Sequence, residues 1–341
     1  MATGNLDAAD LSAVADGGLI NEDVMQAIWD ISAIPLPFTD MIGTSGVSNP
    51  YTEWTQDRLQ DPDLDNAVVD GADASGNDVN TGKRVGNHCQ QSDKVVKVSY
   101  RASASDTVGR SNELAYQLMM RQRELRRDVE AISLTQQASV PDDGDSEAGR
   151  AAGAYAWLET NTDRGDLGGD GGFSNGIVAA PTPGTARALS ETAIRDVAQA
   201  IWEGGGNPTV LMSTPAAIRK LSEYMFTESA RIATLTSDVR EKESAAIATG
   251  SVNVFVTDFG VTLSMMPNRL HPVVEAGNVN VGLFDPDYWQ HGFLQGYRTD
   301  MLAKTGTAEN RQMLVDWTLK ALNEEASGVI ADIDPSLDAV A

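Results

Sequence analysis

Residues 301–330, MLAKTGTAENRQMLVDWTLKALNEEASGVI, hold the pattern that decides the fold. A glycine-centred turn at Thr305-Gly306-Thr307 precedes a long segment in which apolar and polar residues alternate. The apolar residues are Met313, Val315, Trp317, Leu319 and Ala321, and the polar residues are Gln312, Asp316, Thr318 and Lys320. A period of two is typical of a strand with one buried face. We therefore expect a long strand that completes a sheet begun earlier in the chain.

The composition excludes several classes of protein. A chain of 341 residues is long enough for one large core or two ordinary ones. Cys89 is the only cysteine, which rules out an internal disulfide and a thiolate zinc cluster. A chain without disulfides is expected to work in a reducing cell interior, or at least to need no oxidation. No Lys or Arg precedes Arg58, so a basic signal or transit peptide is not expected. No apolar run approaches the roughly 20 residues that span a bilayer, so we expect no membrane partner.

The charge is strongly negative, with 49 acidic residues against 25 Lys and Arg and a net charge of -24. Such a surface repels phosphate backbones, which argues against a protein that reads nucleic-acid sequence. Asp is favoured over Glu, and Arg over Lys, a bias that would keep the surface hydrated in a saline environment. The alternative is an ordinary soluble acidic protein, and stability measured across a salt series would separate the two.

The first hundred residues favour extended structure after one amphipathic segment. Val24, Ile28 and Ile31 are spaced as in a helix, Pro35 and Pro37 stop it, and the chain is then expected to be extended to about residue 50. Strand-like segments at 51–59 and 94–102 flank an acidic excursion of about thirty residues. Loops of that length are functional or disordered, so the two flanking strands are predicted to pair as the stem of one hairpin.

Residues 111–137 predict one long helix, because they contain no Gly or Pro. The apolar residues at helical spacing are Leu114, Leu118, Leu125, Val129 and Ile132. Three arginines on the opposite side, Arg123, Arg126 and Arg127, alternate with Glu124, Asp128 and Glu130. Their spacing favours intrahelical ion pairs, and we favour a solvated or interface-pairing face for these charges over a nucleic-acid patch.

The second half mixes helices and strands. Ser190 is a predicted N-cap, Leu189 and Ile194 stand at the hydrophobic-staple positions, and Gly204 is expected to end that helix. A strand TVLM and a helix STPAAIRKLSEY follow, and then the short strands VNVFVTD, VTLSMMP and VNVGLFD. Together with the long helix, this order predicts an α+β fold.

No segment has the complete pattern of a catalytic or metal site. DPDLDN at Asp61 lacks the glycine and glutamate of an EF-hand, and GNDVNTGKR has the wrong spacing for a phosphate loop. GGDGGF at Gly168 fits a flexible linker, and DFG at Asp258 fits a hairpin turn. His88, His271 and His291 lie far apart without a nucleophile elbow. We therefore predict no catalytic, cofactor-binding or metal residues and no cofactor, and we expect the protein not to be an enzyme.

Seven segments in order resemble the major head proteins of tailed phages, closest to a podovirus-type family with the Hong Kong 97 capsid fold. They are GRSNELAYQ, RDVEAISLTQQAS, AWLETNTDRG, WEGGGNPTVLMSTP, VTDFGVTLSMMPNR, LFDPDYW and LAKTGTAENRQMLVDWTLKALNEEASGVI. Together they span roughly residues 51–330. No one of them is diagnostic, and the resemblance rests on their order.

The resemblance implies a domain layout. It places an N-terminal arm at 1–50, an extended β-hairpin loop at 51–101 and a peripheral domain at 102–185 and 300–330 that contains a spine helix at 111–137. A mixed axial domain would occupy 186–299, and a C-terminal tail 331–341. The opening strand would then be the long strand that returns from the axial domain to the peripheral sheet. Lys83 lies in the implied loop, but nothing around it indicates the lysine–asparagine crosslink of some capsids.

The implied function is self-assembly into hexamers and pentamers that form an icosahedral head shell around double-stranded DNA, in the virion after assembly in the host cytoplasm. The implied partners are further copies of the chain and portal, scaffolding and decoration or cement proteins, with no sequence-specific contact to the DNA. Two alternatives stay open. One is an encapsulin-like compartment shell, and the other is a surface protein that binds cations through its Asp-rich loops.

Overall fold

The computed structural model describes residues 35–60, 62–71, 73, 76, 82–105, 112–224, 254–274, 277–304 and 306–340. The helices are α2 (Pro37–Met41), α3 (Tyr100–Ala104), α4 (Glu113–Ser133), α5 (Ala154–Trp157) and α6 (Glu191–Glu203), with helical residues 215–224 and the 3-10 turns η3 (Pro286–Tyr288) and η4 (Glu324–Ala326). The strands up to residue 179 are β1 (Gly43–Gly46), β2 (Tyr51–Gln56), β3 (Lys83–His88), β4 (Gln90–Ser99), β5 (Thr162–Asp163), β6 (Gly172–Ser174) and β7 (Ile177–Ala179). The later strands are β8 (Val210–Ser213), β9 (Val254–Val256), β10 (Thr262–Pro267), β11 (Val279–Phe284), β12 (Trp289–Met301), β13 (Ala308–Ala321) and β14 (Gly328–Ile333).

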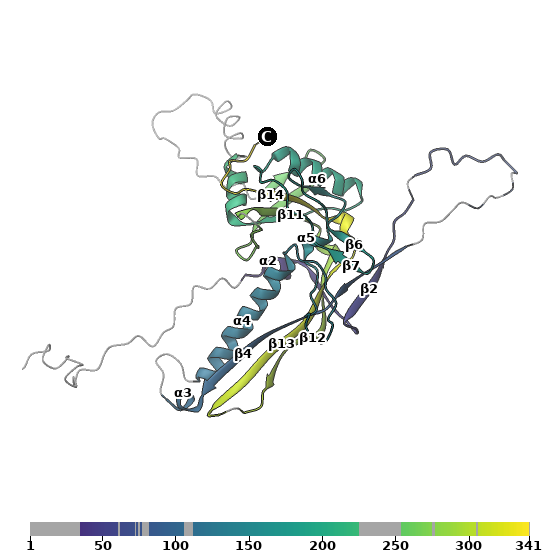
Figure 1. The fold of residues 1–341 in the computed structure, drawn as a ribbon. Helices are drawn as coiled ribbons and strands as arrows, with labels where there is room; N and C mark the ends of the chain where they lie inside the picture. Colours follow the sequence, from purple (N-terminus) through teal and green to yellow (C-terminus); the bar gives the residue numbers. More distant parts are fainter. Residues whose placement is uncertain are drawn as a thin grey trace, which may run out of the picture.

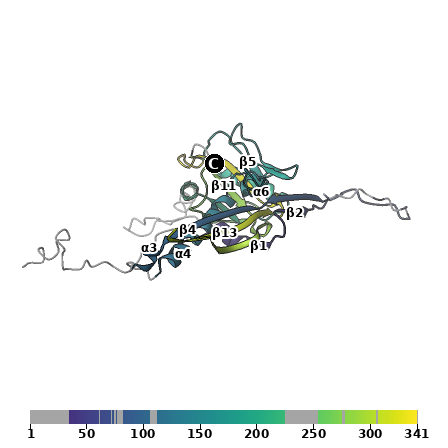
Figure 2. The same cartoon turned by 60° about the horizontal axis from the view of Figure 1, so that its bottom comes forward.

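The described residues build an elongated lower part and a compact upper part (Figure 1). In the lower part a four-stranded sheet, in the order β1-β12-β13-β4, lies beside α4. In the upper part a six-stranded sheet, in the order β5-β14-β11-β8-β10-β9, lies beside α6. Figure 2 shows the hairpin β2–β3 and the α3 end of α4 at opposite ends of the body. The α+β prediction is confirmed.

The predicted long strand is β13, and it lies between two other strands. It pairs antiparallel with β12 and with β4, the latter from Ala308 opposite Ser99 to Trp317 opposite Gln90. All five apolar residues predicted to share a face are buried. The opposite face is covered too near the end of the strand, where the Thr318 hydroxyl donates to the carbonyl of His88 at 2.9 Å. This second cover explains why Asp316 is only 4% exposed.

Helix α4 packs on this sheet with the predicted stripe. Leu125 and Val129 are each 1% exposed, and Leu118 and Ile132 pack against the same core. The helix begins later than predicted, because Asn112 is its N-cap and accepts a hydrogen bond from the backbone N–H of Ala115. It ends at Ser133, four residues before the predicted end.

The predicted ion pairs on α4 are only partly correct. Glu124 does pair within the helix, with Arg121. Asp128 pairs instead with Lys94 of β4, with 2.6 Å between the carboxylate oxygen and Nζ. Glu130 is fully buried, and it binds groups from other parts of the chain. The prediction of intrahelical or interface pairs was wrong for Glu130, because the donors that reach it come from segments remote in sequence.

The segment after Pro35 differs from the expected extended chain. Pro37 stands in the first turn of α2, where a missing backbone N–H costs no hydrogen bond. The side chain of Phe38 is fully buried and holds this short helix on the body. The chain becomes extended only at β1, which pairs parallel with β12. The predicted amphipathic segment at 24–31 lies outside the described residues.

The middle strands of the six-stranded sheet, β8, β11 and β14, are buried on both faces, which explains why they are nearly continuously apolar. Successive residues alternate between two cores. Val210 and Met212 of β8 join the core that contains α4, whereas Leu211 joins the core under α6. The predicted cap of α6 is confirmed, since the Ser190 side chain accepts a hydrogen bond from the N–H of Ala193. Gly204 is the C-cap, as predicted.

The end of the chain is more ordered than a tail. Residues 331–333, the first of the expected C-terminal tail, belong to β14, which lies between β5 and β11. Every residue of β14 is buried. Beyond it, the N–H of Val340 donates to the carbonyl of Leu189 at 2.9 Å. None of the helices in the described ranges is long and apolar enough to cross a membrane.

Candidate functional site

The most prominent functional feature is the hairpin of β2 and β3, which projects from the body (Figure 1). β2 pairs with β3, from Tyr51 opposite His88 to Gln56 opposite Lys83. The predicted pairing of β2 with residues 94–102 was therefore wrong. β4 holds most of that segment and bonds along its whole length to β13, whose alternating pattern is its true complement.

The root of the hairpin is built into the first core. The indole N–H of Trp54 donates to the carbonyl of Ala321 at 2.9 Å, and its ring lies 5.4 Å from that of Trp157. Asn87 is fully buried, and its side-chain amide donates to the carbonyl of Leu319 at 2.7 Å while its oxygen accepts from the N–H of Ala152. The position and direction of the hairpin are thus fixed by the subunit itself.

The hairpin tip, residues 57–82, has the opposite character. Four large apolar side chains among its described residues are almost wholly exposed, at 90% for Leu59, 98% for Leu64, 87% for Val68 and 79% for Val69. Several aspartates in the same stretch are exposed as well, namely Asp57, Asp63, Asp65, Asp70 and Asp73. Covering an exposed apolar surface with a partner stabilises the complex by roughly 25 cal/mol of free energy for each Å² removed from water. The tip is therefore a surface suited to a partner.

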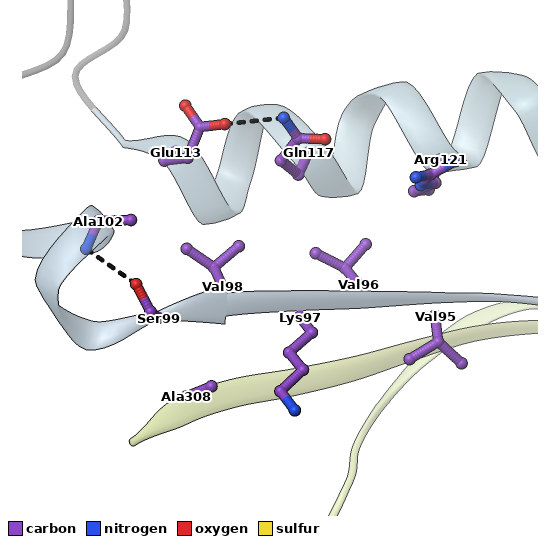
Figure 3. A pocket seen from close by; sticks show the side chains of 10 residues that line it. All are labelled: Val95, Val96, Lys97, Val98, Ser99, Ala102, Glu113, Gln117, Arg121 and Ala308. Carbon is purple, nitrogen blue, oxygen red and sulfur yellow. Dashed lines mark hydrogen bonds between the residues drawn. The ribbon is translucent and has the colours of Figure 1, made fainter. Parts of the chain in front are cut away.

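A second candidate surface is the free edge of the four-stranded sheet. β4 is the outer strand there, and a groove of about 540 Å³ runs along it between α3, α4 and β13 (Figure 3). Val96 and Val98 point toward α4, whereas Lys97 points to the other side of the strand. Gln117 and Glu113 are hydrogen-bonded to each other above the valines. A strand edge with free backbone groups is a template for added extended chain unless charges such as Lys97 protect it.

Of the three histidines, His271 and His291 are buried and His88 is half-buried. His291 Nε2 lies 2.9 Å from the Ser133 hydroxyl, a serine–histidine pair that sequence distance concealed. Both side chains are fully buried, Ser133 also donates to the carbonyl of Val129, and His291 Nδ1 has no hydrogen-bond partner. A substrate could not reach this buried pair, and no carboxylate of the described residues is hydrogen-bonded to the imidazole. Burial lowers the pKa of His291 to about 4.

The other two histidines also bind neighbours within the subunit. His271 Nε2 lies 2.8 Å from the hydroxyl of Tyr155, and burial lowers the pKa of His271 to about 4. The ring of His88 lies 4.6 Å from that of Tyr51 in the hairpin stem, and burial lowers its pKa as well. Burial also raises the pKa of the Cys89 thiol to about 11, which keeps it protonated at neutral pH.

As far as the structure describes them, the weak motifs of the sequence are not brought together into a site. Asp63 and Asp65 of the EF-hand-like stretch lie in the exposed tip, and Asp61 lies outside the described residues. Lys83 and Arg84 of the phosphate-loop-like stretch stand on β3, where Arg84 pairs with Glu53 across the hairpin at 3.2 Å. Over the described ranges, no three His, Cys, Asp or Glu side chains are grouped so that they could hold a metal ion. DFG forms the β9–β10 turn, with Gly260 at φ +86°.

Comparison with known proteins agrees with this geometry. The model of the SU10 major capsid protein family matches residues 3–334. The major capsid protein of Escherichia phage Phieco32 is 26% identical over 323 residues, which cover 86% of this chain and 89% of that protein.

Solved structures show the same fold at low identity. The capsid of a native GTA particle has a TM-score of 0.58 at 10% identity and covers 95% of this chain and 99% of its own. A chain of the Gordonia phage Cozz structure has a TM-score of 0.55 at 14% identity, and the match covers 98% of this chain and 97% of that one. The SrpI encapsulin of Synechococcus elongatus PCC 7942 has a TM-score of 0.56 at 12% identity, and the match covers 95% of this chain and 96% of the encapsulin. The fold is the Hong Kong 97-like fold of phage capsids, and because the family model matches nearly the whole chain, the chain belongs to the SU10 major capsid protein family.

Proposed function

We propose that this major capsid protein builds a phage head shell from hexameric and pentameric capsomers of itself, and that the shell encloses double-stranded DNA without reading its sequence. The observation that carries the proposal is the hairpin tip, where the exposed side chains of Leu59, Leu64, Val68 and Val69 belong to neither core of their own subunit. A neighbouring subunit supplies the missing surface. Head-to-tail contacts of this kind close into rings when the rotation between subunits permits.

The domain roles follow as part of this proposal. Residues 1–50 form the N-terminal arm, α4 is the spine helix of the peripheral domain at 102–185 and 300–330, and the axial domain lies within residues 186–299. The extended loop comprises β2, β3 and the tip between them. β4 and β12 pair with β13 on its two sides, so both then belong to the peripheral sheet, and the axial domain ends before Trp289, where β12 begins.

The proposed setting is the virion, after assembly in the host cytoplasm. Portal, scaffolding and decoration or cement proteins are the further partners. The shell role itself requires no chemical step, so we propose that the protein is not an enzyme. An encapsulin shell is the second candidate, and the support for it is a likeness of fold at 12% identity. The family match over residues 3–334 favours the phage head.

Replacement of the tip tests the proposal. A variant in which residues 58–81 are exchanged for a short Gly-rich turn keeps both stem strands and the buried residues Val85 and Asn87. Its melting temperature should stay within about 2 °C of that of the original protein, because shortening a surface loop costs the subunit little. Electron microscopy should nevertheless show no shells. A folded variant that still assembles would contradict the proposal.

A second variant separates composition from length. Replacing four exposed apolar residues of the tip, Leu59, Leu64, Val68 and Val69, by serine keeps the loop and all its charges. Assembly should be lost or should require a much higher protein concentration. If this variant assembles as the original protein does, the apolar side chains do not carry the contact.

A further inference from the structure

The carboxylate of Glu130 is buried on α4 and takes no part in the surfaces described above. Its exposed fraction is 0%. One oxygen accepts hydrogen bonds from the backbone N–H of Phe38 at 2.8 Å and from the side-chain amide of Asn268 at 2.7 Å. The other accepts from the backbone N–H of Thr39 at 2.8 Å and from the Thr39 hydroxyl at 2.6 Å. Each oxygen thus accepts two hydrogen bonds, which is its full capacity.

The donors come from distant parts of the chain. Phe38 and Thr39 lie in the first turn of α2, where the chain enters the described body from its N-terminal segment. Asn268 follows directly after β10 of the six-stranded sheet. Asn268 is itself held in place, since its N–H donates to the carbonyl of Ser213 at 2.9 Å and its side-chain oxygen accepts from the N–H of Leu270 at 2.8 Å. Glu130 therefore joins α2, the long helix α4 and the end of β10 in the six-stranded sheet at one point.

A buried carboxylate is costly unless its oxygens are satisfied, so the four donors depend on one another. If α2 moves away, Glu130 keeps only the amide of Asn268. If the turn at Asn268 moves, the carboxylate loses a donor and its hold on α2 weakens. We propose that Glu130 is a latch that fixes where the N-terminal arm leaves the body and couples that point to the six-stranded sheet through Asn268.

The latch can be tested in the unassembled subunit by amide hydrogen exchange at Phe38 and Thr39. Glu130→Gln keeps the size of the side chain but turns one acceptor oxygen into an NH₂ group, which faces donors. Exchange at both amides should become faster by on the order of 100-fold, as expected when hydrogen bonds to a charged group are lost. Amides in the middle of β13 should keep their protection, which shows that the body is still folded.

Glu124→Gln is the matched control. Glu124 stands on the same helix, is partly exposed and pairs with Arg121, so its amide variant should leave exchange at Phe38 and Thr39 unchanged. A folded Glu130→Gln protein with unchanged exchange at these two amides would overturn the latch.

Asn268→Ala tests the coupling between α2 and the six-stranded sheet. It also keeps the proposal testable if the Glu130→Gln protein does not fold. Asn268 makes none of the hydrogen bonds of Phe38 and Thr39, yet its loss should speed exchange at both amides by about tenfold, because one charged hydrogen bond is removed. Thr39→Val, which removes only the hydroxyl, should give a change of the same direction at Phe38. If Asn268→Ala leaves both amides as protected as before, the arm is held independently of the six-stranded sheet and the coupling is refuted. Because no shell is needed, these outcomes do not depend on the assembly proposal.

Discussion

Leu125 and Glu130 lie little more than a turn apart on α4, and both are buried, one among apolar side chains and the other among hydrogen-bond donors. The spacing of apolar residues predicted the first. It could not predict the second, because Glu130 follows a run of alternating charges that is typical of a solvated helix face. Its donors lie 91 to 138 residues away. Burial of a charged residue depends on such distant partners, which local spacing does not reveal.

Leu125→Asp should prevent folding or cost about 3–5 kcal/mol of unfolding free energy, because it places an unpaired charge among Val129 and the other residues of the first core. Met119→Asp is the matched control on the same helix, since Met119 is 42% exposed. It should change the unfolding free energy by about 0.5 kcal/mol or less. Urea denaturation checks both, and a Leu125→Asp protein of normal stability would mean that the buried face is wrongly assigned.

His291 should make the subunit less stable in mild acid. Its pKa is about 4 in the folded protein against 6.5 ordinarily, so between these values the unfolded chain binds the extra proton. The contribution of neutral, buried His291 to the free energy of unfolding is therefore fully present above pH 6.5 and is lost as pH falls toward 4. From pH 7.5 to pH 5 the loss should be about 2 kcal/mol.

His291→Gln isolates this effect, because glutamine can keep a hydrogen bond to Ser133 without titrating. The variant should be less stable at pH 7.5, yet its unfolding free energy should fall by about 2 kcal/mol less than that of the original protein between pH 7.5 and pH 5. Equal pH slopes for the two proteins would show that His291 does not carry the effect.

At the scale of elements, the sequence predicted the strands better than their partners. β13 was evident because one of its faces is apolar from Met313 to Ala321, and the capped helix α6 was evident from Ser190 and Gly204. The pairing of β2 with β3 was missed because the residues of β3, KRVGNH, do not alternate clearly. β12 was missed for a related reason, since two register shifts interrupt its pairing with β13 and so its alternation.

Gly86 is the residue that lets the hairpin stem close. A Cβ atom at this position would lie 2.7 Å from the ring of Tyr51 and 2.8 Å from the carbonyl oxygen of Thr52. Gly86→Ala should therefore push the two strands apart and cost about 1–3 kcal/mol. Gly46→Ala is the control, because nothing lies within 4 Å of the corresponding Cβ. Thermal melting should show the loss for Gly86→Ala alone, and equal melting curves would mean that the stem tolerates the side chain.

At the scale of the whole molecule, two cores share one six-stranded sheet, and the hairpin extends beyond both. The sequence indicated this layout through its resemblance to capsid proteins, because no local pattern shows which surface a neighbouring subunit covers. The net charge of -24 opposes association of subunits, and salt screens such repulsion. Assembly should therefore be favoured by rising ionic strength.

Electron microscopy of the purified protein over a range of salt and protein concentrations tests the central claim most directly. If the chain is a shell subunit, images should show closed shells or separate hexameric and pentameric capsomers, with more of them at higher ionic strength. The variant that lacks residues 58–81 should give only single subunits under the same conditions. A protein that stays monomeric at every salt and protein concentration would contradict the account.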